Sequence, residues 1–299
     1  MLYDTIKIVK SLAKVPKEVK NGVNEPFYWN NCLWLPRYNK LGEIVCYYSH
    51  LNNLKLWLRG SELSITNSLQ KFYCNNNHSP FSYSQVNEAI HYLIAHFDCD
   101  LSAAEVKKVA VGTVIDAFPE DTFNSWEQFK NINPSFMKNK TKIYGVNFKA
   151  TNYNIKGYDK TYQVKAESGL TLPKSVIRFE CEAYAKYYNQ RKNSIPIYKL
   201  SDLVDKNVFK QLSLDLLEVY TLIKKNKVID FGKLSPSEIK LLATYGNSEI
   251  SLGLKQHHKH TYKKERQQYL KLIKGFPETK YEKEVFKKLE DQIHFCINT

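Results

Sequence analysis

Short alternating runs of apolar and polar residues dominate the first two hundred positions of the chain, and they predict β-strands. Asn and Gly turns separate the early runs, and the N-terminal stretch has the pattern of a strand followed by a basic loop. The later strands flank a turn-like SGLTLP segment. The predicted strands are Cys32–Pro36, Glu43–Ser49, Leu54–Arg59, Val109–Phe118, Asn152–Val164 and Ser175–Tyr184.

Two segments in the same region have a helical rather than an alternating period. Ser61–Phe72 predicts a short helix after a strand, and a firmer helix follows Ser82, where apolar residues recur at helical spacing. Many strands grouped with a few helices predict an α+β fold, with an antiparallel sheet and flanking helices. We expect this α+β domain to cover residues 1–200.

From Ser201 onward the pattern becomes helical, which predicts a second domain over residues 201–299. The LSPSEIKLLATYG segment has Ser235 as N-cap, Pro236 at the first helical position and Glu238 placed to close a capping box. The other predicted helices are Leu203–Lys224, Lys259–Ile273 and Tyr281–Ile293. Their basic faces are typical either of a small helical DNA-binding unit or of an ordinary solvated surface.

Composition narrows the class of protein. No run of about eighteen apolar residues exists, and the N-terminus lacks the pattern of a signal peptide, so we expect no membrane partner and an intracellular location. The six cysteines are scattered without a CxxC pair, which argues against zinc clips and disulfides.

The charge points to a polyanionic partner. Lys and Arg number 44 against 30 Asp and Glu, a formal net charge of +14. Neutralisation of phosphates is the usual source of affinity for such a surface. The alternative is that a Lys-rich, Arg-poor composition produces the same net charge without any polyanionic partner. The 21 Tyr and 15 Phe also supply candidate stacking surfaces for unpaired bases.

The segment KGYDKTYQ is the first candidate for chemistry. Continued strand alternation places Lys156, Tyr158, Lys160 and Tyr162 on one face. Two lysines beside a tyrosine favour the phenolate, which is a nucleophile, and they can neutralise a phosphate under attack. Gly157 leaves room for a backbone or a ligand to approach. The alternative is a solvent-facing basic strand with a half-buried tyrosine.

Acidic residues in apolar strands are the second candidate. Asp116 ends the strand VIDAF, where it must be paired, protonated, bound to a metal or capping the next turn. In VIRFECEA, Arg178, Glu180 and Glu182 share one face. That face can hold Mg²⁺ or Mn²⁺, or it can be a cross-strand ladder of ion pairs.

The order of three motifs carries a resemblance: VIDAF (114–118), YDKTYQ (158–163) and IRFE (177–180). The chain resembles the rolling-circle replication initiators of filamentous phages, and more distantly the plasmid initiators with the same permuted layout of the nickase fold. In the phage family the corresponding motifs are of the type IDAxF, YxKxxE and RFE. The segment from YGNSEISL to KLIKG is similar to the C-terminal part of that family.

The resemblance implies roles for particular residues. Tyr158 falls on the family's nucleophile and Lys160 on the lysine that follows it, while Asp116 and Glu180 match the acids that support a Mg²⁺ or Mn²⁺ ion. Glu182 and Gln163 are weaker candidates for the same metal, because Gln163 stands where the family has an acid. The paired histidines of the broader nickase superfamily are absent from the sequence. His258-Lys259-His260 mimics their spacing, but we expect it to contact phosphate or to be merely exposed.

These observations lead to one functional prediction and its rivals. We expect a metal-dependent endonuclease and strand transferase that nicks and rejoins single-stranded, hairpin or cruciform origin DNA through a 5′-phosphotyrosine. Tyr162 is the rival nucleophile. A host helicase and polymerase are candidate partners, and the predicted DNA-binding residues are Lys156, Arg178, Lys263, Lys264 and Arg266. The rival functions are a non-catalytic DNA-binding regulator and a structural protein that neutralises nucleic acid.

The charge generates a testable prediction. Because binding releases counterions from the phosphates, the logarithm of the DNA affinity should fall linearly with the logarithm of the salt concentration, by about 0.7 for each contacted phosphate of a single strand. Titrations at several salt concentrations measure this slope. An affinity that hardly changes with salt would show that the charge only reflects composition.

Overall fold

The computed structural model describes residues 3–140, 142–190 and 195–299. Contacts divide the chain into two units, the first running to Lys224 and including Val285–Thr299, and the second comprising Lys225–Glu284. This division differs from the predicted boundary at residue 201, because α7 (Lys206–Thr221) buries Phe209, Leu212 and Leu216 within the first unit. None of the helices in the described ranges has the length and apolar character needed to cross a membrane.

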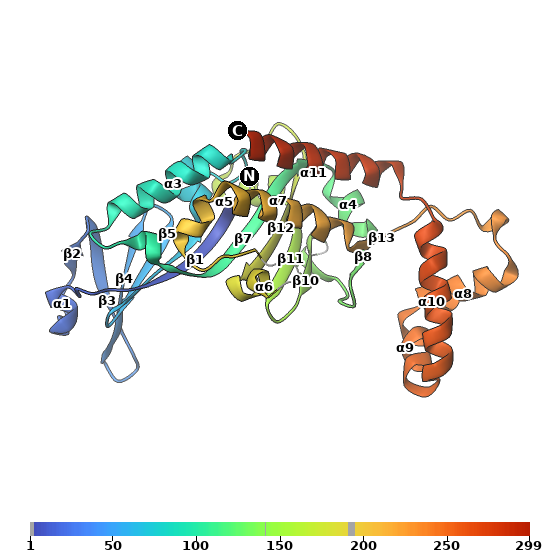
Figure 1. Cartoon of the computed structure of the whole chain (residues 1–299), viewed down its shortest axis with the longest axis horizontal. Coiled ribbons are helices and arrows are strands. Elements are labelled where there is room, and N and C mark those ends of the chain that lie inside the picture. Colours follow the sequence, from blue (N-terminus) through green and yellow to red (C-terminus); the bar gives the residue numbers. More distant parts are fainter. Residues whose placement is uncertain (1–2, 141, 191–194) are drawn as a thin grey trace. The chain divides into compact units, whose positions relative to one another are not determined.

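A large antiparallel sheet forms the centre of the first unit, as the α+β prediction requires (Figure 1). The described residues supply eleven strands. In their order across the sheet they are β2 (Phe27–Trp29), β3 (Cys32–Tyr38), β4 (Ile44–Leu51), β5 (Leu54–Arg59), β6 (Glu62–Ser68), β1 (Tyr3–Ser11), β7 (Glu105–Asp116), β12 (Val176–Tyr184), β11 (Tyr153–Asp159), β10 (Lys142–Lys149) and β9 (Ser135–Asn139). A separate two-stranded ribbon contains β8 (Trp126–Phe129) and β13 (Ile223–Lys225).

Helices pack on the first unit's sheet, and α3 and α7 lie along the same side of it (Figure 1). There Phe209 of α7 contacts Tyr3 of β1 and Tyr83 of α3, with ring centroids 5.4 and 5.3 Å away. The unit's helices are α1 (Lys17–Lys20), α2 (Leu69–Cys74), α3 (Tyr83–His96), α4 (Pro119–Ser125), α5 (Lys160–Ser168), α6 (Ala185–Asn189), α7 and the part of α11 (Lys280–Asn298) from Val285 onward, with short 3₁₀ turns at Leu101–Ala103 and Leu200–Val204.

The alternation predicted for VIRFECEA is confirmed, and it gives β12 two different faces. On the covered face Phe179 contacts Trp126 and Tyr220, with ring centroids 5.7 and 5.1 Å away. The opposite face carries Arg178 and Glu180. We call the side of the sheet with Arg178 the polar face.

Gly157 belongs to the covered face, which corrects its expected role. A Cβ atom at this position would lie 2.5 Å from the Trp126 indole and 2.9 Å from the Phe123 ring. The group that approaches the Gly157 backbone is therefore a core aromatic side chain rather than a ligand. This close packing fixes β11 against the core beneath the polar face.

Two sequence-based element predictions are wrong in their boundaries. The strand predicted over Asn152–Val164 ends at Asp159, whose carboxylate accepts a 2.8 Å hydrogen bond from the Tyr162 backbone N–H and caps α5. Lys160 and Tyr162 therefore do not share a strand face with Tyr158. The helix predicted over Ser61–Phe72 is β6 followed by α2, which Ser68 caps.

The second unit contains α8 (Pro236–Gly246), α9 (Ser248–His257) and α10 (Lys259–Gly275), preceded by a 3₁₀ turn at Phe231–Lys233. The predicted capping box of Ser235 and Glu238 is confirmed. Leu242, Tyr245 and Tyr269 form the buried centre of this small helical unit.

Candidate active site

Tyr158 projects from the polar face at a point where the neighbouring strands leave space. In the sheet it lies opposite Arg178 of β12 and Gly145 of β10. A Cβ atom at Gly145 would lie 2.9 Å from the Tyr158 Cβ and 2.7 Å from the Met137 Cε. The absence of a side chain at Gly145 is therefore what allows the tyrosine side chain to stand beside β10.

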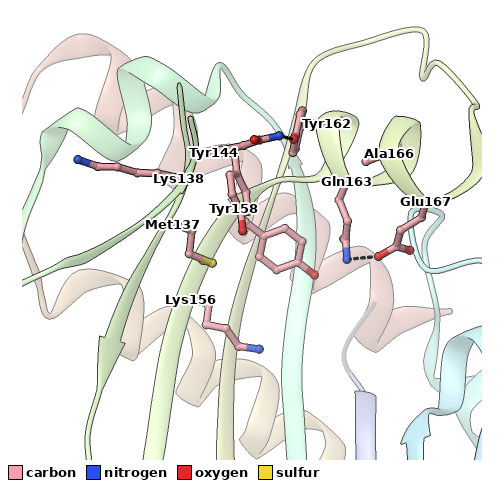
Figure 2. Close-up of a pocket in the computed structure, with 10 residues that line it drawn as sticks. Met137, Lys138, Tyr144, Lys156, Tyr158, Tyr162, Gln163, Ala166 and Glu167 are labelled. Carbon is pink, nitrogen blue, oxygen red and sulfur yellow. Dashed lines mark hydrogen bonds between the residues drawn. The ribbon is translucent and has the colours of Figure 1, made fainter. Parts of the chain in front are cut away.

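The Tyr158 side chain lines a cavity of about 530 Å³ between the sheet and α5. Figure 2 shows its hydroxyl directed toward Gln163 and Glu167 of α5, which are joined by a 2.7 Å hydrogen bond. In the described part of the chain, no group hydrogen-bonds to that hydroxyl. The cavity is lined by Met137, Lys138, Asn139, Tyr144, Lys156, Tyr158, Tyr162, Gln163, Ala166 and Glu167.

The electrostatic environment of Tyr158 differs from the one expected from sequence. Burial raises the pKa of its hydroxyl well above the usual value, the nearby Glu180 raises it further, and Arg178 opposes both. The predicted stabilisation of the phenolate by flanking lysines is wrong, because Lys156 pairs with Glu180 and Glu182. Tyr158 is therefore a neutral phenol at rest, and a nucleophilic attack requires a group that accepts its proton.

Lys160 lies near the Tyr158 ring, behind the residues that line the cavity, and its surroundings are unusual for a lysine. It is the first residue of α5 and is fully buried. Its Nζ donates to Asn77 Oδ1 at 2.7 Å and to Gln163 Oε1 at 2.8 Å, and it lies 5.8 Å from the centroid of the Tyr158 ring. Burial, followed by the charge of Arg178, lowers the pKa of Lys160 to about 8. Near neutral pH this amine can therefore both donate and accept a proton.

A chain of buried ion pairs lies beside Tyr158. Arg178 Nη2 lies 3.1 Å from Asp4 Oδ2, and Arg178 Nε donates to Glu180 Oε2 at 2.7 Å. Lys156 Nζ bridges Glu180 and Glu182 at 2.6 and 2.8 Å. Gly112 lies opposite Glu180 on β7, where a Cβ atom would come within 2.5 Å of the Glu180 Cβ.

The four predicted metal ligands are not brought together. Asp116 lies opposite Val176, four residues from Glu180 and roughly 13 Å away along β12, and its half-exposed carboxylate pairs with Lys174 at 3.4 Å. Gln163 is bonded to Lys160 and Glu167. In residues 3–140, 142–190 and 195–299 no three acids, histidines or cysteines gather where they could hold a metal ion.

The carboxylates that do lie in the site are held by cations. Both oxygens of Glu180 contact Lys156 or Arg178, and both oxygens of Glu182 contact Lys108 or Lys156. Of the two possibilities for the VIRFECEA face, the structure has the ion-pair ladder, and this donor set does not fit Mg²⁺ or Mn²⁺ as it is arranged. A metal requirement stays a prediction.

The predicted DNA-binding residues fall into two groups. Lys156 and Arg178 belong to the ion-pair chain of the first unit. On α10 of the second unit, Lys263 and Lys264 are exposed, and the Arg266 guanidinium stacks over the Tyr262 ring at 5.7 Å. His258 and His260 are exposed at the start of the same helix. Contacts of these residues with DNA stay predictions.

Sequence reasoning missed several residues of the cavity. Tyr144 comes from β10 and stacks against Tyr162, with ring centroids 5.3 Å apart. The Tyr162 hydroxyl accepts a hydrogen bond from Asn139 of β9. The alternating stretch KIYGVNFK was the available signal for β10. Asn77 and Asp4, by contrast, reach the site only through the tertiary fold.

Comparison with known proteins gives a structural likeness. No family model matches the chain, and no curated protein matches it. Among solved structures, the chain is similar to the rolling circle replication initiator protein from Geobacillus stearothermophilus. The match covers 97% of this chain and 96% of that chain, with a TM-score of 0.48 and 9% sequence identity. The narrower resemblance to filamentous-phage initiators stays a prediction.

The ion-pair chain generates a prediction about stability. Replacing Glu180 by Gln leaves Arg178 and Lys156 without their shared buried anion, which should lower the free energy of unfolding by about 3–5 kcal/mol. The pKa of Glu180 is lowered to about 2, so its stabilisation is present above the unfolded pKa near 4.3 and is lost as the pH falls toward 2. The gap between wild type and variant should narrow over that range in urea denaturation.

The matched control is Glu105→Gln, which removes an exposed carboxylate paired with Lys107. Its effect should stay below about 1 kcal/mol. If both variants unfold at the same urea concentration as wild type, the buried chain does not stabilise the fold as described.

Proposed function

We propose that this protein is a rolling-circle replication initiator that nicks and rejoins origin DNA, with Tyr158 as the nucleophile. The observation that carries the proposal is a tyrosine hydroxyl that lines a cavity, without a hydrogen-bond partner in the described residues, beside a buried lysine with a pKa of about 8. In addition, Tyr158 of β11 lies directly opposite Arg178, the first residue of the RFE motif, on the neighbouring strand β12.

The proposed reaction is a transesterification at one phosphodiester. The Tyr158 oxygen attacks the phosphorus, and the bond between phosphorus and the 3′ oxygen breaks. The products are a 5′-phosphotyrosine and a free 3′-OH, which primes synthesis. In the reverse reaction the 3′-OH attacks the phosphotyrosine and restores the strand. Each direction conserves the number of phosphate ester bonds.

Lys160 is the group that we assign to proton transfer. In its neutral form it accepts the phenolic proton as attack begins, and as an ammonium it returns a proton to the departing 3′ oxygen. Lys156, held as a cation by Glu180 and Glu182, lines the cavity where the scissile phosphate would lie and is the proposed contact for that phosphate. Asn77 and Gln163 hold the Lys160 amine in place through its two hydrogen bonds.

The remaining parts of the proposal concern partners and metal. Origin DNA in single-stranded, hairpin or cruciform form is the proposed substrate, a host helicase and polymerase are proposed partners, and the bacterial cytoplasm is the proposed location. The requirement for Mg²⁺ or Mn²⁺ is also part of the proposal, and parallel reactions with each ion and with EDTA test it.

The first prediction concerns the nucleophile. Tyr158→Phe should abolish nicking of a supercoiled plasmid that carries the native origin, while changing DNA affinity less than about twofold, because only one hydroxyl is removed. Agarose gels and anisotropy titrations measure the two quantities. Tyr162→Phe and Tyr144→Phe, which alter the same cavity, are the controls and should still nick.

Nicking by Tyr158→Phe at the wild-type rate would overturn the assignment. Loss of nicking in Tyr162→Phe alone would transfer the role to the rival tyrosine. DNA binding by the wild-type protein without any nicking would favour the non-catalytic regulator.

The second prediction concerns pH. Because neutral Lys160 accepts the phenolic proton, the single-turnover nicking rate should rise about tenfold per pH unit below 8 and level off above it. Lys160→Met should nick at least a hundredfold more slowly and lose the inflection near pH 8. Lys138→Met, at the rim of the same cavity, should keep the inflection. An unchanged profile in Lys160→Met would remove Lys160 from the mechanism.

A further inference from the structure

The half of the sheet farther from Tyr158 has an open face with an ordered set of aromatic and basic side chains. Cross-strand partners share a face, so the register defines this set directly. Leu35 lies opposite Tyr48, and Tyr48 lies opposite Trp57. In the next row His50 lies opposite Lys55, Lys55 opposite Thr66, and Thr66 opposite Lys7. We call these residues, together with Arg37, the N-terminal open face.

Aromatic rings on this face form a small platform. The Tyr48 and Trp57 rings lie 5.5 Å apart at 38°, and both side chains are only half-buried. The Arg37 guanidinium lies 4.3 Å over the Tyr48 ring, and the His50 ring contacts its edge at 5.1 Å. A core aromatic cluster would be sealed from solvent, whereas the Tyr48 and Trp57 side chains are each partly exposed.

Basic side chains form a row next to the platform. His50, Lys55 and Lys7 are exposed, and Lys7 lies directly opposite Lys108 of β7. Among the residues the structure describes, no carboxylate pairs with Lys7 or Lys55. Lys7 and Lys55 therefore present uncompensated positive charge on this face, which is suited to a polyanion.

The row is continuous with the candidate active site. Lys108 pairs with Glu182, which pairs with Lys156, the neighbour of Tyr158 on the polar face. From β4 to β11 the sheet has six strand-to-strand steps, or roughly 29 Å at the usual spacing. A single strand of DNA that lies across the N-terminal open face can therefore continue along the sheet to the Tyr158 cavity.

We propose that the N-terminal open face binds single-stranded DNA, with bases stacked on Tyr48 and Trp57 and phosphates along Arg37, Lys55 and Lys7. Accessible aromatic rings beside a basic row are the features with which proteins hold unpaired strands, because every base presents a π-face. Paired bases in a duplex cannot stack on such a platform, which is why the inference commits to a single strand. It rests on the proposed function only for the identity of the strand as origin DNA.

The test measures binding without cleavage, in a Tyr158→Phe background. Anisotropy titrations use a fluorescein-labelled 25-nucleotide oligothymidine and, separately, a duplex of the same length. Tyr48→Ala with Trp57→Ala should weaken oligothymidine binding at least about tenfold and leave duplex binding within about twofold. Lys7→Glu with Lys55→Glu should weaken it and flatten its salt dependence.

Two controls separate the surface from general effects of charge and folding. Lys210→Glu reverses one lysine charge at an exposed position on α7, which packs on the other face of the sheet, and should change oligothymidine binding less than about twofold. Tyr48→Phe with Trp57→Phe keeps the rings and should bind as the parent does.

The outcomes distinguish the inference from the proposed function. Unchanged oligothymidine affinity in the alanine variant would overturn the inference, even if the wild-type protein nicks DNA. An equal loss for duplex and single strand would also overturn it, because the face would then serve a duplex. If the alanine variant loses affinity for the single strand and the wild-type protein does not nick DNA, the result supports this face while the proposed function fails.

Discussion

The buried contact of Arg178 with Glu180 and Asp4 is the interaction on which the site depends. A buried guanidinium is costly unless carboxylates surround it, and those carboxylates come from a neighbouring position on β12 and from β1, on the far side of β7. Gly112 leaves the surface of β7 free of a side chain at this crossing. The contact therefore fixes three strands in one register and determines where Tyr158, directly opposite Arg178, stands.

The same ion pairs decide which groups remain available for chemistry. Glu180 and Glu182 are neutralised by lysine and arginine, so neither is a free base, and Lys156 is held as a cation. What remains is a neutral phenol that lines the cavity and, near its ring, a buried amine whose pKa is about 8. An arrangement with fixed charges around two mobile protons suits a reversible transfer of a phosphate between two oxygens.

Sequence patterns were sufficient for the sheet class, the two-faced strand β12, and the capped helices that follow Ser82 and Ser235. They failed where one residue ends an element, because a single Asp159 cap converts an apparently continuous strand into a strand and a helix. Contacts such as Lys160 with Asn77 join residues 83 positions apart, and no local pattern contains them. Strand register also separates Asp116 from Glu180, a spacing that the motifs alone do not define.

The central claim is that Tyr158 forms a covalent bond with DNA, and the direct test is to trap that bond. Wild-type protein is incubated with a labelled single-stranded origin oligonucleotide, the complex is denatured and digested with nuclease and protease, and the modified peptide is sequenced by mass spectrometry. The account predicts a nucleotide phosphate on the tyrosine of the peptide that contains Gly157-Tyr158-Asp159. A modified Tyr162 or Tyr144, or a cleaved strand with no modified tyrosine, would contradict it.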